Sequence, residues 1–146
     1  MREGLGLSEM EPNPEVRRTE TTGVYRQLPW DDETVTRFWR WQSRFPEEYF
    51  TNLFGDRIAR TLAPWIRSGN GSVLDYGCGL GFLPRHLAAL GCRVWATDFS
   101  KEAVALTNSR NAGVAGFEGA DTVAEICSRG QHFSRIVSIE VIEHLD

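Results

Sequence analysis

The chain has 146 residues, 41% hydrophobic and 25% charged, which is enough apolar sequence for one packed domain. A net charge of −4 and a pI near 5.4 disfavour a constitutive nucleic-acid binder, because such proteins neutralise phosphates with a basic surface. The sequence contains no run of 18 apolar residues and no signal-peptide pattern. Its three cysteines show neither disulfide nor zinc spacing. We therefore expect a cytoplasmic protein without membrane contact.

The N-terminal half divides into a polar segment and an aromatic-rich segment. Residues 1–23 contain two prolines and few residues that bury surface, which predicts a disordered tail. Residues 24–68 are rich in aromatic side chains within helical sequence, which predicts a helical cap. The helix signals, in chain order, are Asp31 or Asp32 as an N-cap, Pro46 at a helix start, and Ile58, Leu62 and Ile66 on one helix face.

Residues 69–146 alternate short β-branched runs with helical segments, the pattern of βαβ units around a parallel sheet. The expected strands are residues 72–76, 93–97, 114–118 and 134–139. The expected helices begin at Leu83, after an N-cap at Ser100, and at Asp121. The predicted fold class is α/β, a Rossmann-like parallel sheet with an N-terminal helical cap.

The strongest functional signal is a glycine-rich loop between an expected strand and an expected helix, Asp75-Tyr76-Gly77-Cys78-Gly79-Leu80-Gly81. Alternate glycines let the backbone turn sharply and approach a ligand, while the following helix directs free N–H groups toward it. Asp98 ends the second expected strand, where a carboxylate can accept hydrogen bonds from both ribose hydroxyls. Together the two signals predict a site for a nucleoside cofactor.

The segment from Ser72 to Leu145 resembles the class I S-adenosylmethionine-dependent methyltransferases. In that family an acidic residue opens the glycine loop, here Asp75, whereas dinucleotide-binding loops usually have an apolar residue there. The resemblance implies S-adenosyl-L-methionine as cofactor. It also implies the cofactor-binding residues: Asp75, Gly77, Cys78, Gly79 and Gly81 along the loop, Asp98 at the ribose, Phe99 along the adenine, Asp121 at the adenine amino group, and Ile139 at the end of the fourth strand.

The last motif, Glu140-Val141-Ile142-Glu143-His144, is similar to the fourth-strand motif of the ubiquinone-type O-methyltransferases. A helix starting near Glu140 would place Glu140, Glu143 and His144 on one face. These three residues are the candidate catalytic groups, because each can take a proton from the acceptor. In some relatives these positions bind a divalent metal. We favour a solvated helix face or a wall of the cofactor pocket over metal ligation.

The expected function is methyl transfer to a small-molecule acceptor, with O-methylation favoured. Two alternatives stay open: a non-catalytic fragment that binds the nucleoside, and an NAD-dependent dehydrogenase, although the loop lacks Gly-x-Gly-x-x-Gly spacing. The resembled family has seven strands in the order 3-2-1-4-5-7-6, and only the first four precede Asp146. We therefore expect a carboxyl-terminally truncated chain without turnover, which self-associates through the unpaired edge of its fourth strand.

Overall fold

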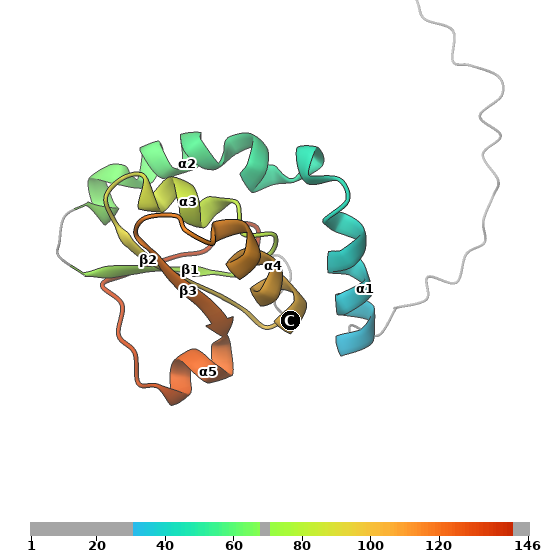
Figure 1. Ribbon diagram of the computed structural model, residues 1–146. Helices are drawn as coiled ribbons and strands as arrows, with labels where there is room; N and C mark the ends of the chain where they lie inside the picture. The colour runs from blue at the N-terminus through green and yellow to red at the C-terminus, as the bar shows by residue number, and fades with distance from the viewer. Residues whose placement is uncertain (1–30, 68–70, 142–146) are drawn as a thin grey trace, which may run out of the picture.

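The computed structural model describes residues 31–67 and 71–141 (Figure 1). The expected tail at residues 1–23 lies outside them. Within the described parts, no helix is both long enough and apolar enough to cross a membrane. In chain order the elements are α1 (Asp32–Gln42), the 3-10 helix η1 (Pro46–Glu48), α2 (Phe50–Ile66), β1 (Ser72–Tyr76), α3 (Leu83–Ala88), β2 (Arg93–Asp98), α4 (Lys101–Asn111), β3 (Phe117–Thr122), α5 (Val123–Ser128) and β4 (Arg135–Val137).

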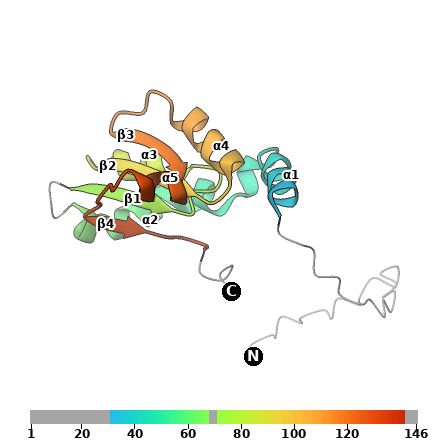
Figure 2. The ribbon, with the colours of Figure 1, turned by 90° about the horizontal axis from the view of Figure 1, so that it is seen from below.

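The four strands form one parallel sheet in the order β3-β2-β1-β4. In its register β1 pairs with β2 from Ser72 opposite Arg93, and with β4 from Val73 opposite Arg135. The α/β class and the strand order expected for the first four strands are thereby confirmed. Figure 2 shows the strands pointing toward the side of the molecule on which α1 lies. Ligands of such sheets bind at the carboxyl ends of the strands.

The main core lies between the sheet and the helices α2 and α3, with α5 on the opposite face of the sheet (Figure 1). Leu83 and Leu87 of α3 are almost fully buried, because they recur on one face of their helix. Around them pack buried aliphatic side chains from α2 and from three strands, among them Ala59, Ile66, Val73, Val94 and Val137. This core fixes β1, and with it the loop that follows.

The third strand lies later in the chain than expected. The sequence predicted residues 114–118, but β3 is Phe117–Thr122, because the chain first makes a turn in which the Val114 N–H donates to the Asn111 carbonyl. The strand ends where Thr122 caps α5: its N–H donates to Glu125 Oε2 at 2.9 Å, and its Oγ1 accepts from the Glu125 N–H. The expected helix start at Asp121 is therefore wrong, since Asp121 belongs to the strand.

The fourth strand is shorter than expected. The sequence predicted residues 134–139, but only Arg135–Val137 pair with β1. Within the described residues β4 lies at the edge of the sheet. Val137 points into the core, whereas Ile136 points to the opposite face and is 65% exposed.

The capping box at Thr122 gives a first testable prediction. Thr122→Ala should lower the free energy of unfolding by about 1 kcal/mol, because the Glu125 N–H loses its acceptor at the start of α5. Urea denaturation measures the change. Thr61→Ala is the matched control, because its hydroxyl donates to the Arg57 carbonyl on the exposed face of α2. Equal effects of the two substitutions would contradict a special role for the cap.

Candidate functional site

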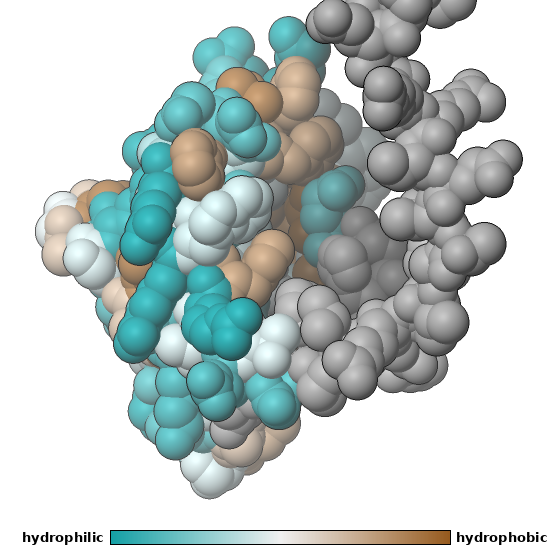
Figure 3. All heavy atoms as spheres, turned by 90° about the vertical axis from the view of Figure 1, so that its right-hand side faces the viewer, coloured by the Kyte–Doolittle hydropathy of each residue, from teal (hydrophilic) through white to brown (hydrophobic). Residues whose placement is uncertain are grey.

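A cavity of about 540 Å³ lies where the carboxyl ends of the strands meet the N-terminal helices. This volume suits a small molecule or a cofactor. Figure 3, a view from the α1 side, shows apolar surface recessed between polar residues. The floor follows the strands and comprises Asp75, Tyr76, Gly77, Cys78, Asp98, Phe99, Ile139, Glu140 and Val141. The roof comprises Val35, Phe38, Trp39 and Gln42 of α1 together with Tyr49, Phe50 and Thr51.

The roof owes its shape to the amphipathic pattern of α1. Val35, Phe38, Trp39 and Gln42 recur at i, i+3, i+4 and i+7, so they share the helix face that lines the cavity. The N-cap of the helix is Asp31, whose carboxylate accepts a hydrogen bond from the Thr34 N–H at 2.9 Å. On α1 the Arg40 Nε lies 3.1 Å from a carboxylate oxygen of Glu102 in α4, which ties the roof to the sheet domain.

Two glycines of the loop pack against other parts of the protein and do not border the cavity. A Cβ at Gly79 would overlap the Tyr49 hydroxyl and lie 2.8 Å from the Trp39 ring. A Cβ at Gly81 would lie 2.7 Å from Cα of Thr107 in α4. Neither glycine lines the cavity. The loop is thus glycine-rich partly because the roof and α4 pack directly on its backbone.

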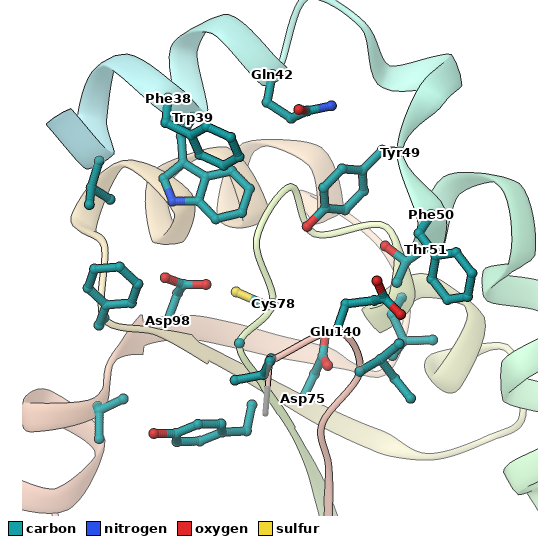
Figure 4. Close-up of a pocket in the computed structure, with 18 of the residues that line it drawn as sticks. Phe38, Trp39, Gln42, Tyr49, Phe50, Thr51, Asp75, Cys78, Asp98 and Glu140 are labelled. Atoms are coloured by element: carbon teal, nitrogen blue, oxygen red, sulfur yellow. The ribbon is translucent and has the colours of Figure 1, made fainter. Parts of the chain in front are cut away.

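Asp98 holds the loop and faces the cavity. Its side chain accepts from the N–H of Gly79 and from that of Ser100, both at 3.0 Å, and the residue is only 4% exposed. Burial raises the pKa of Asp98, while these N–H groups oppose the increase. In Figure 4 the indole nitrogen side of Trp39 faces this carboxylate. A carboxylate has about four lone-pair sites, so this one can still accept a hydrogen bond from a ligand hydroxyl.

Asp75 is a buried acid beside the same cavity. It is 2% exposed, and its Oδ2 has no hydrogen-bond partner within the described part of the chain. Burial, with a contribution from the charge of Asp98, raises the pKa of Asp75 to about 7. Trp39 Nε1 and Thr51 Oγ1 are also buried, and they too find no partner among residues 31–67 and 71–141. The three residues line one cavity, where their unpaired groups can offer a ligand an acceptor, a donor and a hydroxyl.

The cavity brings together most of the described residues that the sequence singled out. Seven line it: Asp75, Gly77, Cys78, Asp98, Phe99, Ile139 and Glu140. Asp121 lies in β3, where its carboxylate is 2.6 Å from Arg129 Nη1. Glu143 and His144 lie outside the described residues. Glu140 has a φ of +57° and is not helical, so the helix expected to align the three candidate catalytic groups does not begin there.

Sequence reasoning missed the polar groups of the roof. Trp39, Tyr49 and Thr51 come from a segment whose only visible signal was its density of aromatic residues, which fits a packed helix as well as a binding surface. Only the position of α1 over the strand ends shows that this segment lines a binding surface and is not simply a packed helix. For metal ligation, no group of three His, Cys, Asp or Glu side chains suited to an ion occurs among the described residues.

The chain resembles known methyltransferases in sequence and in fold. Residues 38–146 match a family described as a methyltransferase domain. A 75-residue stretch is 36% identical to a ubiquinone biosynthesis O-methyltransferase of Agrobacterium fabrum, covering 50% of this chain and 30% of that relative. Magnesium protoporphyrin IX methyltransferase from Synechocystis PCC 6803, solved with bound SAM, superimposes with a TM-score of 0.53 at 21% identity, over 83% of this chain and 67% of that one.

A second solved structure, a glycopeptide N-methyltransferase with S-adenosyl-L-homocysteine, superimposes with a TM-score of 0.52 at 24% identity, over 63% of this chain and 41% of that one. The parallel sheet in the order β3-β2-β1-β4, with its cavity at the strand ends, is thus the fold of the class I S-adenosylmethionine-dependent methyltransferases. The chain belongs to the methyltransferase domain family. It spans less than a third of the length of the Agrobacterium relative.

Proposed function

We propose that this chain binds S-adenosyl-L-methionine in the cavity and serves methyl transfer to a small-molecule acceptor. The observation that carries the proposal is the unsatisfied Asp75 Oδ2, buried with Trp39 Nε1 and Thr51 Oγ1 around one cavity. Buried polar groups are normally paired, so a ligand with a cation and several hydroxyls fits this lining. Bound there, S-adenosyl-L-methionine supplies a methyl group that its sulfonium already activates.

The proposed cofactor site runs from Asp98 to Asp75 across the loop (Figure 4). Asp98 accepts hydrogen bonds from the ribose hydroxyls through its free lone pairs, and Phe99, at the cavity edge, lies along the adenine. Gly77 and Cys78 border the methionine part. The Asp75 carboxylate faces the methionine ammonium, whose positive charge offsets the cost of burying the acid.

The acceptor would lie beside Phe50, Thr51 and Glu140, at the other end of the cavity from Asp98 (Figure 4). Glu140 is exposed, and its carboxylate can take a proton from an acceptor hydroxyl. The Agrobacterium relative, which is named an O-methyltransferase, supports oxygen as the acceptor atom. Glu143 and His144 remain candidate partners of Glu140 in this step.

We propose two further properties, a location and a surface for self-association. Cys78, Cys92 and Cys127 are free, which suits a reducing, cytoplasmic location. The edge of β4, together with its exposed Ile136, provides a surface for self-association.

Calorimetric titration with S-adenosyl-L-homocysteine and with NAD tests the proposed cofactor. We expect the first ligand to bind and NAD to give no heat of binding. Asp98→Asn should weaken binding of S-adenosyl-L-homocysteine by about 1.5–3 kcal/mol, because charge-assisted hydrogen bonds to the ribose are lost. Asp56→Asn, on the exposed face of α2, controls for the change in charge.

The result that separates binding from catalysis is turnover. An unchanged affinity in folded Asp98→Asn would contradict the ribose assignment, and tighter binding of NAD would support the dehydrogenase. Binding of S-adenosyl-L-homocysteine without any methyl transfer would instead support the non-catalytic alternative.

A further inference from the structure

A pair of arginines lies outside the cavity, where α2, α3 and α4 approach one another. Arg85 of α3 and Arg110 of α4 both contact the ring of Phe82, with their guanidinium carbons 5.3 and 3.7 Å from the ring centre. Arg85 Nη2 also donates to the side-chain oxygen of Asn52 in α2 at 3.3 Å. Three helices thus bring two cations to one aromatic ring.

Within residues 31–67 and 71–141, the arginines paired with a carboxylate all have exposed side chains. Four arginines whose side chains are 50–75% exposed each lie within 3.1 Å of a carboxylate oxygen: Arg40, Arg60, Arg93 and Arg129. In the described parts of the chain, Arg85 and Arg110 are the only half-buried arginines, and neither has a carboxylate partner there. Buried charges are usually the paired ones.

The electrostatics of the pair are unfavourable as they stand. Arg110 Nε is buried and has no hydrogen-bond partner among the described residues. Burial and the nearby charge of Arg85 lower the pKa of the Arg110 guanidinium. Stacking on Phe82 offsets part of this cost but neutralises neither charge. An anion that contacts both guanidinium groups would neutralise both charges.

We propose that Arg85 and Arg110 form a binding site for the phosphate group of a small ligand, separate from the cavity. A phosphate dianion matches the two positive charges, and its tetrahedral oxygens accept from two guanidinium groups on different helices, whereas one carboxylate carries a single charge. The ring of Tyr49 lies 5.9 Å from that of Phe82 and also reaches the loop at Gly79. The bound phosphate would therefore lie one ring away from the cavity roof.

Thermal unfolding in sodium phosphate and in sodium chloride of equal ionic strength tests this site, with inorganic phosphate as the probe. We expect phosphate to raise Tm by a few degrees beyond chloride, with a saturable concentration dependence. Arg85→Gln and Arg110→Gln should each reduce the phosphate affinity about tenfold or more, and Arg110→Lys should retain part of it. Arg93→Gln is the control, because Arg93 is exposed and paired with Glu118.

Equal effects of phosphate and chloride would overturn the proposal, as would a phosphate effect that persists in both glutamine variants. If Arg110→Gln fails to fold, Arg85→Gln alone decides the outcome, because Arg85 stacks less closely on Phe82. Titration with S-adenosyl-L-homocysteine in parallel reports on the cavity, so failure of the cofactor assignment and failure of the phosphate site remain distinguishable.

Discussion

Gly81→Ala is expected to lower the free energy of unfolding by about 2–5 kcal/mol, because two costs add at this position. Gly81 has a φ of +72°, a conformation that alanine adopts with strain. Its new Cβ would also lie 2.7 Å from the backbone of Thr107, so α4 must move. Asn111 Nδ2 donates to the Gly81 carbonyl at 2.9 Å, and that contact would be disturbed as well.

Gly91→Ala separates the two costs. Gly91 has a φ of +85°, but nothing lies within 4 Å of its added Cβ, so only the backbone strain of about 1–2 kcal/mol applies. Urea denaturation of both variants gives the difference that packing against α4 contributes. Equal losses in the two variants would mean that α4 does not hold the loop.

Asp75→Asn is expected to stabilise the ligand-free protein at pH 8 while it weakens cofactor binding at least tenfold. The pKa of Asp75 is about 7 in the folded protein, against about 4 in an unfolded chain, so ionising the buried acid costs the fold about 4 kcal/mol. Asparagine has no charge to bury. We expect a gain of about 2–4 kcal/mol at pH 8, since the amide needs hydrogen bonds of its own.

The sign of the pH dependence follows from the raised pKa. The contribution of protonated Asp75 to stability is fully present below pH 4 and is lost as the pH rises through 7. The stability difference between Asp75→Asn and wild type should therefore grow from pH 4 to pH 8 in denaturation experiments. Asp56→Asn, which removes a charge from the exposed face of α2, controls for net charge.

In the wild type, cofactor affinity should increase with pH, whereas the stability contributed by Asp75 decreases. The affinity for S-adenosyl-L-homocysteine should rise as the pH passes 7, because the ionised Asp75 pairs with the ligand ammonium. Calorimetry at several pH values measures this. An affinity that is flat from pH 6 to pH 8, or an asparagine variant that binds normally, would remove Asp75 from the site.

The sequence predicted the sheet domain well where periodicity and loop chemistry agree. The strand at Ser72–Tyr76 and the cap at Ser100 are where the pattern placed them, because short buried strands and N-caps carry strong local signals. The third strand was predicted too early in the chain, at residues 114–118, because Phe117–Thr122 has little apolar alternation, with Phe117 and Ala120 as its only apolar side chains. The Thr122-x-x-Glu125 capping box marks the end of this strand in the sequence.

The strand-end residues of the site were predictable from the sequence, whereas the roof residues were not. Asp75 and Asp98 sit at the ends of strands, so sequence position alone places them at one edge of the sheet. The roof cannot be placed in this way, since helix periodicity shows which face of α1 is apolar and not what that face covers. The unpaired charge of Arg110 likewise emerges only when burial is known.

The way α1 is held has a consequence for how fast the cavity exchanges its contents. The apolar face of α1 borders the cavity, and outside it the helix is tied by Arg40 to Glu102, an exposed pair of small energetic value. Detaching α1 also uncovers Val35, which is 3% exposed, and the ring of Trp39, which packs on the loop at Gly79, so opening the cavity costs apolar burial as well as this pair. The residence time of a bound molecule should be set by the lifting of this helix, while the floor stays rigid.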